Sequence, residues 1–313
     1  WVDQLGLAQT ALEAGDVGIF RDPRDGSATI TIIGTVLPGE LIAEDNGFRL
    51  IEGQIGEAGR STILSARNNI TFSIGSALSG EIEIDGRGTV FYDGVAPDME
   101  SIAVNDDSSF ETGALAVTAG DMQVDGQVSL AGTHNGDVEI NGSGELVEGG
   151  VIAGNLTTNG DFTVSGQVDA GVDGKVINSA GGDDDALTLN GATINADLEN
   201  ESDGNLAVAG NNTVDGEVLN RGEIFADGEE AASLAVSAGN SFINEGRITE
   251  EGDLTIQADN INLQNGGEVD SAAVKLIGNI NNSGDLTYST AAQISNTVQN
   301  NEDGEIVVRA DVD

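Results

Sequence analysis

The chain has 313 residues, a formal net charge of −43 from 54 acidic and 11 basic side chains, and no cysteine. This charge excludes ordinary binding to the phosphate backbone of nucleic acids, which requires a basic surface. The lack of cysteine excludes disulfides and thiolate metal sites. No apolar run approaches the roughly 18 residues of a membrane-spanning helix, so we expect no membrane insertion.

Residues 1–97 are predicted to form an irregular β region or cap. The apolar positions before Gly15 are compatible with a short amphipathic helix. Alternation of apolar and polar residues over 28–33, 69–74 and 81–84 then predicts short strands separated by glycine turns. All three prolines and six of the 11 basic residues lie at or before position 97. We therefore place a domain boundary there and assign residues 98–313 to regular repeats.

Asparagine recurs through the C-terminal part of the chain with a period of about 20 residues. Each asparagine follows an apolar run and precedes a turn that contains glycine. The positions are Asn178, Asn200, Asn220, Asn244, Asn265, Asn282 and Asn300. A fixed period of this size indicates a repeat architecture. A corner asparagine repeated once per coil is expected to stack into a ladder of side-chain amide hydrogen bonds, which is a structural role.

Each repeat resolves into three apolar segments, which predict three short strands. After Asn244 the apolar positions are Ile248, then Leu254 and Ile256, then Ile261 and Leu263. Three strands per repeat make a three-sided coil, and stacked coils place equivalent strands side by side in parallel sheets. The predicted fold class is therefore all-β, a three-sided parallel β-helix, or β-solenoid, with about 20 residues per coil.

The repeat unit, exemplified by Leu219-Asn220-Arg221-Gly222-Glu223-Ile224, resembles the parallel β-helices of large secreted bacterial surface proteins. These are the filamentous-haemagglutinin-like adhesins and the autotransporter passenger regions, and the resemblance covers residues 101–313. It implies a right-handed solenoid that is secreted to the bacterial cell surface. It also implies a structural or adhesive role in a surface layer or matrix, with surface glycans or receptors as partners.

Catalysis is not expected from the chemistry of the side chains. A histidine-based triad or a zinc site is disfavoured because the chain has one histidine and no cysteine. That residue, His134, lies between Gly132 and Gly136 and is predicted to be an exposed turn residue. Two alternatives stay open. A β-helical polysaccharide-active enzyme would need paired acids and a basic residue in a groove, and a phage-type fibre would need three-fold chain association.

Calcium is the ligand that the acidic corners favour, because it prefers carboxylate and carbonyl oxygens. The candidate ligands are Asp183, Asp184 and Asp185 in one corner and Glu302 and Asp303 in another. Ordinary solvated turns are the alternative interpretation of both corners.

The two ends of the repeat array suggest self-assembly. The segment near Ile30 and Ile32 and the segment near Ile306 and Val308 both have the pattern of aliphatic strands. An unpaired strand edge is a template for another chain. We expect these four residues to mark edges through which copies add head to tail, which gives a homopolymeric filament because the contact does not close on itself.

Overall fold

The computed structural model describes the chain except for residues 1–12, 22–26, 97, 172, 183–184, 229, 250–252, 265–266, 272–273, 290–297, 302–303 and 310–313. The described residues are all-β and contain no helix. The short helix expected before Gly15 falls almost entirely on residues 1–12, outside the described part of the chain.

The chain divides into two compact units, which are described separately. The N-terminal unit comprises residues 1–144 and 149–151, and the C-terminal unit comprises residues 145–148 and 152–313. The division passes through β18 (Ser143–Leu146) and β19 (Val151–Ile152).

The strands of the N-terminal unit are β1 (Val17–Phe20), β2 (Ala28–Thr31), β3 (Thr35–Val36), β4 (Glu40–Ala43), β5 (Phe48–Ile51), β6 (Gln54–Ile55), β7 (Ser61–Ala66), β8 (Thr71–Ile74), β9 (Ala77–Asp85), β10 (Thr89–Tyr92), β11 (Asp98–Val104), β12 (Ser109–Thr112), β13 (Val117–Ala119), β14 (Asp121–Val124), β15 (Gln127–Leu130), β16 (Thr133–Asn135) and β17 (Val138–Ile140). The strands of the C-terminal unit are β20 (Leu156–Thr158), β21 (Asp161–Val164), β22 (Gln167–Val168), β23 (Lys175–Asn178), β24 (Leu187–Asn190), β25 (Thr193–Ile194), β26 (Asp197–Asn200), β27 (Asn205–Ala209), β28 (Asn211–Val214), β29 (Val218–Asn220), β30 (Glu223–Ala226), β31 (Ala232–Val236), β32 (Ser241–Asn244), β33 (Arg247–Ile248), β34 (Leu254–Leu263), β35 (Glu268–Ser271), β36 (Val274–Asn282), β37 (Asp285–Ser289), β38 (Val298–Asn300) and β39 (Glu305–Arg309).

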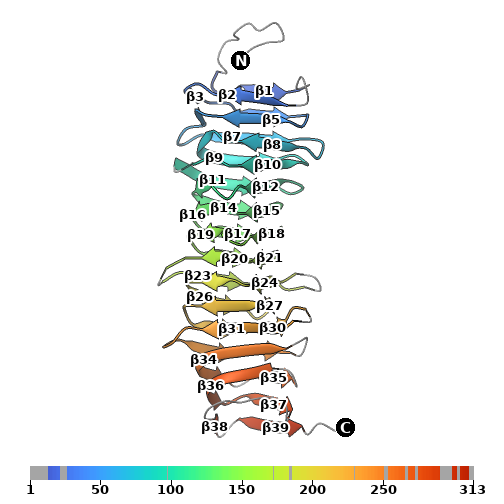
Figure 1. The fold of residues 1–313 in the computed structure, drawn as a ribbon, viewed down its shortest axis with the longest axis vertical. Coiled ribbons are helices and arrows are strands. Elements are labelled where there is room, and N and C mark those ends of the chain that lie inside the picture. The colour runs from blue at the N-terminus through green and yellow to red at the C-terminus, as the bar shows by residue number, and fades with distance from the viewer. Residues whose placement is uncertain are drawn as a thin grey trace. The chain divides into compact units, whose positions relative to one another are not determined.

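Within each unit the strands pair in parallel with their counterparts in the next coil (Figure 1). In the C-terminal unit one ladder joins β23, β26, β29 and β32. A second joins β25, β28, β31 and β34, and a third joins β24, β27, β30 and β33. Three ladders make three sides. The parallel β-solenoid predicted from the repeat is thus confirmed, with roughly 20 residues per coil.

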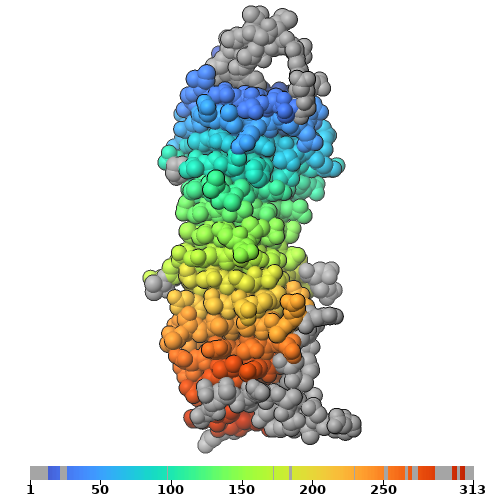
Figure 2. Space-filling model, in the orientation of Figure 1, coloured from blue at the N-terminus to red at the C-terminus, as the bar shows by residue number. Residues whose placement is uncertain are grey.

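The core of each coil is a column of inward side chains that continues in register through successive coils. In the C-terminal unit Leu206, Ile224 and Ile248 occupy one column, and all three side chains are fully buried. Each such side chain contributes about 1.5–3 kcal/mol through removal of apolar surface from water. Within each unit, the side chains of successive coils follow one another in chain order on the face seen in Figure 2.

Strand pairing in the N-terminal unit continues through the position where the sequence predicts a boundary. β9 pairs with β11, so strands on the two sides of residue 97 belong to one ladder. Coil length varies here: Val17 pairs with Glu40 and Glu40 with Ile63, 23 residues apart each time, whereas Ile63 pairs with Glu83, 20 residues on. Because the turns differ in length, the repeat of this unit has no fixed period in the sequence. The division between the two compact units lies near residues 145–151.

Candidate functional site

A ladder of asparagine side chains lies inside one corner of the C-terminal unit. The Nδ2 atom of Asn178 donates to Oδ1 of Asn200, Asn200 donates in the same way to Asn220, and Asn220 donates to Asn244, each at 2.7 Å. These four side chains are fully buried. The structure therefore has the amide ladder that the repeat predicts, with all its hydrogen bonds running in one direction along the stack.

The second Nδ2 hydrogen of each ladder asparagine is also used. Asn200 donates it to the backbone carbonyl of Glu223 at 3.0 Å, and Asn220 donates it to that of Arg247 at 3.2 Å. Each accepting carbonyl belongs to the first residue of a strand in the next coil. The ladder thus fixes the spacing between coils and also the start of the following strand.

The ladder differs from the sequence prediction at its beginning and in its middle. It begins one coil early, because Thr158 Oγ1 donates to Asn178 Oδ1 at 2.9 Å. Strand register places Leu263, and not Asn265, opposite Asn244, so the prediction for Asn265 is wrong. Asn265 itself lies outside the described residues. The ladder resumes with Asn282, which donates to Asn300 at 2.8 Å.

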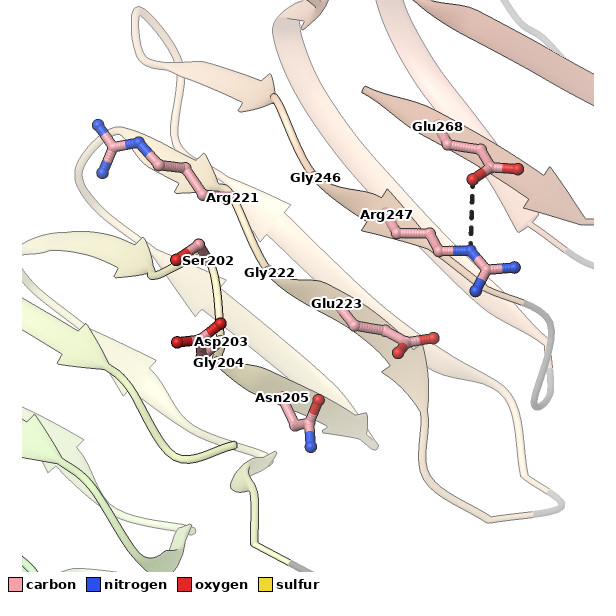
Figure 3. Close-up of a pocket in the computed structure, with 10 residues that line it drawn as sticks. All are labelled: Ser202, Asp203, Gly204, Asn205, Arg221, Gly222, Glu223, Gly246, Arg247 and Glu268. Carbon is pink, nitrogen blue, oxygen red and sulfur yellow. Dashed lines mark ion pairs between the residues drawn. The ribbon is translucent and has the colours of Figure 1, made fainter. Parts of the chain in front are cut away.

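A polar groove lies beside this corner of the C-terminal unit (Figure 3). Its volume is about 350 Å³. It is lined by Ser202, Asp203, Gly204, Asn205, Arg221, Gly222, Glu223, Gly246, Arg247 and Glu268. Glycine forms the floor because the turns stack too closely for a side chain. A Cβ atom on Gly222 would lie 2.1 Å from the carbonyl oxygen of Gly204, and one on Gly246 would lie 2.2 Å from that of Gly222.

Charges of both signs surround the groove. Arg247 Nε lies 3.4 Å from a carboxylate oxygen of Glu268. Arg221 pairs instead with Glu199 and Glu245, and Figure 3 shows its side chain pointing away from those of Glu223 and Arg247. The groove therefore offers one guanidinium group, carboxylates and an amide to a ligand.

Glu199 joins two basic residues across three coils. Its hydrogen bond with Lys175 is the main reason why the pKa of this carboxyl is below its usual value, and the hydrogen bond with Arg221 adds to the effect. The partner side chains are 50% and 39% exposed. Because solvent screens such pairs, we expect each to contribute less than about 1 kcal/mol to stability. The ion pairs therefore orient the side chains along the corner and contribute little to the stability of the fold.

The calcium candidates fall largely outside the described residues. This applies to Asp183, Asp184, Glu302 and Asp303. Asp185 is described and exposed. The pKa of Asp161 is raised, first because Asp161 is partly buried and second because the negative charge of Asp185 lies nearby. In the described part of the chain, no three acidic or histidine side chains form a group that could hold a metal ion. Calcium binding at these corners stays a prediction.

The strand edges predicted for self-assembly lie at the end of a ladder in each unit. β2 is the first described strand of its ladder in the N-terminal unit and pairs with β5, and β39 is the last described strand of its ladder in the C-terminal unit and pairs with β37. The N–H groups of Ala28 and Ile32 donate to the β5 side. By alternation, Thr29 and Thr31 present their N–H groups to the free side of β2, whereas Ile30 points inward and is partly exposed.

At the other edge, the Glu305 N–H donates to Gly284 on the β37 side. Ile306 and Val308 therefore direct their backbone N–H groups to the free side of β39. The Ile306 side chain is partly exposed, and that of Val308 lies outside the described residues.

His134 is buried, and the prediction of an exposed turn residue is wrong. It lies on β16 in the N-terminal unit and is 1% exposed. Its Nδ1 atom is 2.9 Å from Thr118 Oγ1 in the preceding coil. Burial lowers the pKa of the imidazole to about 4, although the Asp137 backbone and the carboxylates of Asp121 and Asp137 act in the opposite direction. The neighbouring glycines Gly132 and Gly136 lie at closely packed turns, so they do not indicate that His134 is exposed to solvent.

Comparisons with protein-family models, curated proteins and solved structures found no match for the chain. The residues that the structure describes include no helix long and apolar enough to cross a bilayer.

Proposed function

We propose that the chain is an extracellular structural and adhesive β-solenoid of a bacterial cell surface, and that copies assemble head to tail into filaments. The observation that carries the proposal is the modular pairing of coils. Each coil offers the next one the same three parallel ladders, whether that coil belongs to the same chain or to a second copy. β2 and β39 each end a parallel ladder of their own unit, so the addition of β39 of one copy to β2 of another would continue parallel pairing.

Strand-edge variants test assembly. Thr31→Pro and Ile306→Pro each remove an N–H group that faces the outer side of an edge strand, and neither N–H group has a backbone partner among the residues that the structure describes. We expect wild-type protein to form long thin filaments in electron micrographs and either proline variant to form none. Thr31→Ala and Ile306→Val keep the N–H groups and should assemble normally. Circular dichroism checks that each variant is folded.

Two outcomes contradict head-to-tail assembly. Wild-type protein that stays as single particles excludes it, and proline variants that polymerise like wild type exclude these edges. Trimeric association in solution would instead favour a phage-type fibre. Imaging in calcium and in chelator extends the experiment, because loss of filaments in chelator would give the acidic corners a cation-bridging role.

The groove of the C-terminal unit supports the adhesive part of the proposal. Its guanidinium, carboxylate and amide groups match the hydroxyls and acidic groups of surface glycans. We expect Arg247→Ala to weaken binding to the glycans that the wild-type protein recognises on an array by about tenfold, since charge-assisted hydrogen bonds are lost. Lys275→Ala, a charge removal outside the groove, should leave binding unchanged. An array with no bound glycan, or equal binding by Arg247→Ala and wild type, would contradict a glycan site here.

A further inference from the structure

Asparagine followed by glycine recurs at several turns of the chain. The pairs in the described residues begin at Asn46, Asn135, Asn141, Asn159 and Asn190. In such a pair the glycine backbone nitrogen attacks the side-chain amide of the asparagine when the glycine N–H makes no hydrogen bond and the side chain can turn toward it. Glycine favours the step because it has no side chain to obstruct the approach. The local hydrogen bonds therefore decide which of these pairs reacts in the folded chain.

Hydrogen bonds restrain most of these asparagines. Asn46 Oδ1 accepts from the Thr71 N–H at 2.9 Å, and Asn135 Nδ2 donates to the Thr118 carbonyl at 3.3 Å. Asn141 Nδ2 donates to Asp125 at 2.9 Å, while the N–H of the following glycine is itself used in a hydrogen bond to the Val124 carbonyl. Asn159 also has an interaction partner.

Asn190 differs from the others. It ends β24 at an exposed corner before β25, and Gly191 has a φ of +72° with nothing within 4 Å of a Cβ position. Among the residues that the structure describes, neither the Asn190 side chain nor the Gly191 N–H has a hydrogen-bond partner. Both reacting groups are thus accessible and unrestrained at the same corner.

We propose that Asn190 is the preferred site of spontaneous deamidation and isomerisation among the asparagine–glycine pairs that the structure describes. The Gly191 nitrogen attacks Cγ of Asn190, a new N–Cγ bond forms a five-membered imide, and the bond from Cγ to the side-chain nitrogen breaks. Ammonia leaves with the proton from the Gly191 nitrogen. Water then opens the imide at either carbonyl, which gives aspartate or isoaspartate at position 190.

The product changes the corner in two ways. Aspartate adds a negative charge to a chain whose net charge is already −43. Isoaspartate routes the backbone through the side-chain carbon and so lengthens the connection between β24 and β25 by one atom. Because the corner is exposed and there is open space around the Cβ position of Gly191, the coil can accept either product without opening the core.

Peptide mapping of the purified full chain, aged at mildly alkaline pH, tests the proposal. The peptide with Asn190 should gain one mass unit first, and the peptides with Asn46 and Asn141 should react at least about fivefold more slowly, because a hydrogen bond must open before they react. Aging in denaturant removes these restraints, so the differences should largely disappear. Asn190→Gln should abolish the early product.

The preference for Asn190 is overturned if Asn46 or Asn141 reacts as fast as Asn190 in the folded chain. It is also overturned if unfolding accelerates the reaction at Asn190 as much as at Asn46 and Asn141. Neither measurement depends on whether the chain forms filaments.

Discussion

Replacing Asn220 by alanine should destabilise the C-terminal unit by about 3–5 kcal/mol. The change removes the 2.7 Å hydrogen bonds from Asn200 and to Asn244 and the 3.2 Å bond to the Arg247 carbonyl. Water cannot replace these partners, because the asparagine side chains of the ladder are fully buried. A buried polar group left without a partner costs about 1–3 kcal/mol. The substitution takes the ladder donor away from Asn244 Oδ1, whereas Asn200 Nδ2 keeps its hydrogen bonds to the carbonyls of Gly204 and Glu223.

Asn281 provides a matched control for burial. Its Nδ2 atom donates to Asn262 Oδ1 at 3.0 Å, so it forms the same kind of amide pair, but on the partly exposed outer face. We expect Asn281→Ala to cost less than about 1 kcal/mol, because water replaces the lost partner. Urea unfolding followed by circular dichroism gives both values. Equal losses for the two variants would show that burial of the ladder contributes nothing.

Lowering the pH from 6.5 to 4 should cost the N-terminal unit about 3 kcal/mol through His134 alone. The pKa of this imidazole is about 4 in the folded chain, against 6.5 in the unfolded chain. Between these values the unfolded chain binds more protons, so stability falls as the pH falls through this window. More than about one pH unit above 6.5 both states are neutral at this residue, and the dependence disappears.

The measurement compares the free energy of unfolding of wild type and His134→Leu across this pH range. The leucine variant loses the contact with Thr118 Oγ1 and is expected to be less stable at neutral pH. The acidic residues titrate in both proteins, so the difference between the two curves isolates the histidine. That difference should shrink toward pH 4. Parallel curves would mean that the buried imidazole is already protonated or that its burial has no cost.

The repeat is predictable where local chemistry fixes it. A corner asparagine followed by a tight glycine turn has few alternatives, so Asn200, Asn220 and Asn244 were placed correctly on the ladder. The prediction for Asn265 fails because the spacing of asparagines alone does not set the register. The inward column sets it, and that column places Leu263 opposite Asn244.

Other features of the site depend on contacts that sequence spacing does not show. Thr158 begins the ladder through a hydroxyl, which the asparagine pattern cannot include. The flanking glycines predict an exposed turn at His134, but its inward position follows from the pairing of β13 with β16. The groove also depends on pairing, since Asn205, Glu223 and Arg247 are brought together by register.

The register of the ladders has a consequence for how the chain folds. Each strand meets a partner about one repeat away, as Asn200 meets Asn220 and Asn220 meets Asn244. The entropy lost on closing a loop depends only weakly on the length of that loop, so it is similar for every coil although the coils differ in length. Folding can therefore advance coil by coil from a nucleus. A chain of this kind avoids the slow search between distant strands that delays most β proteins, however many coils it contains.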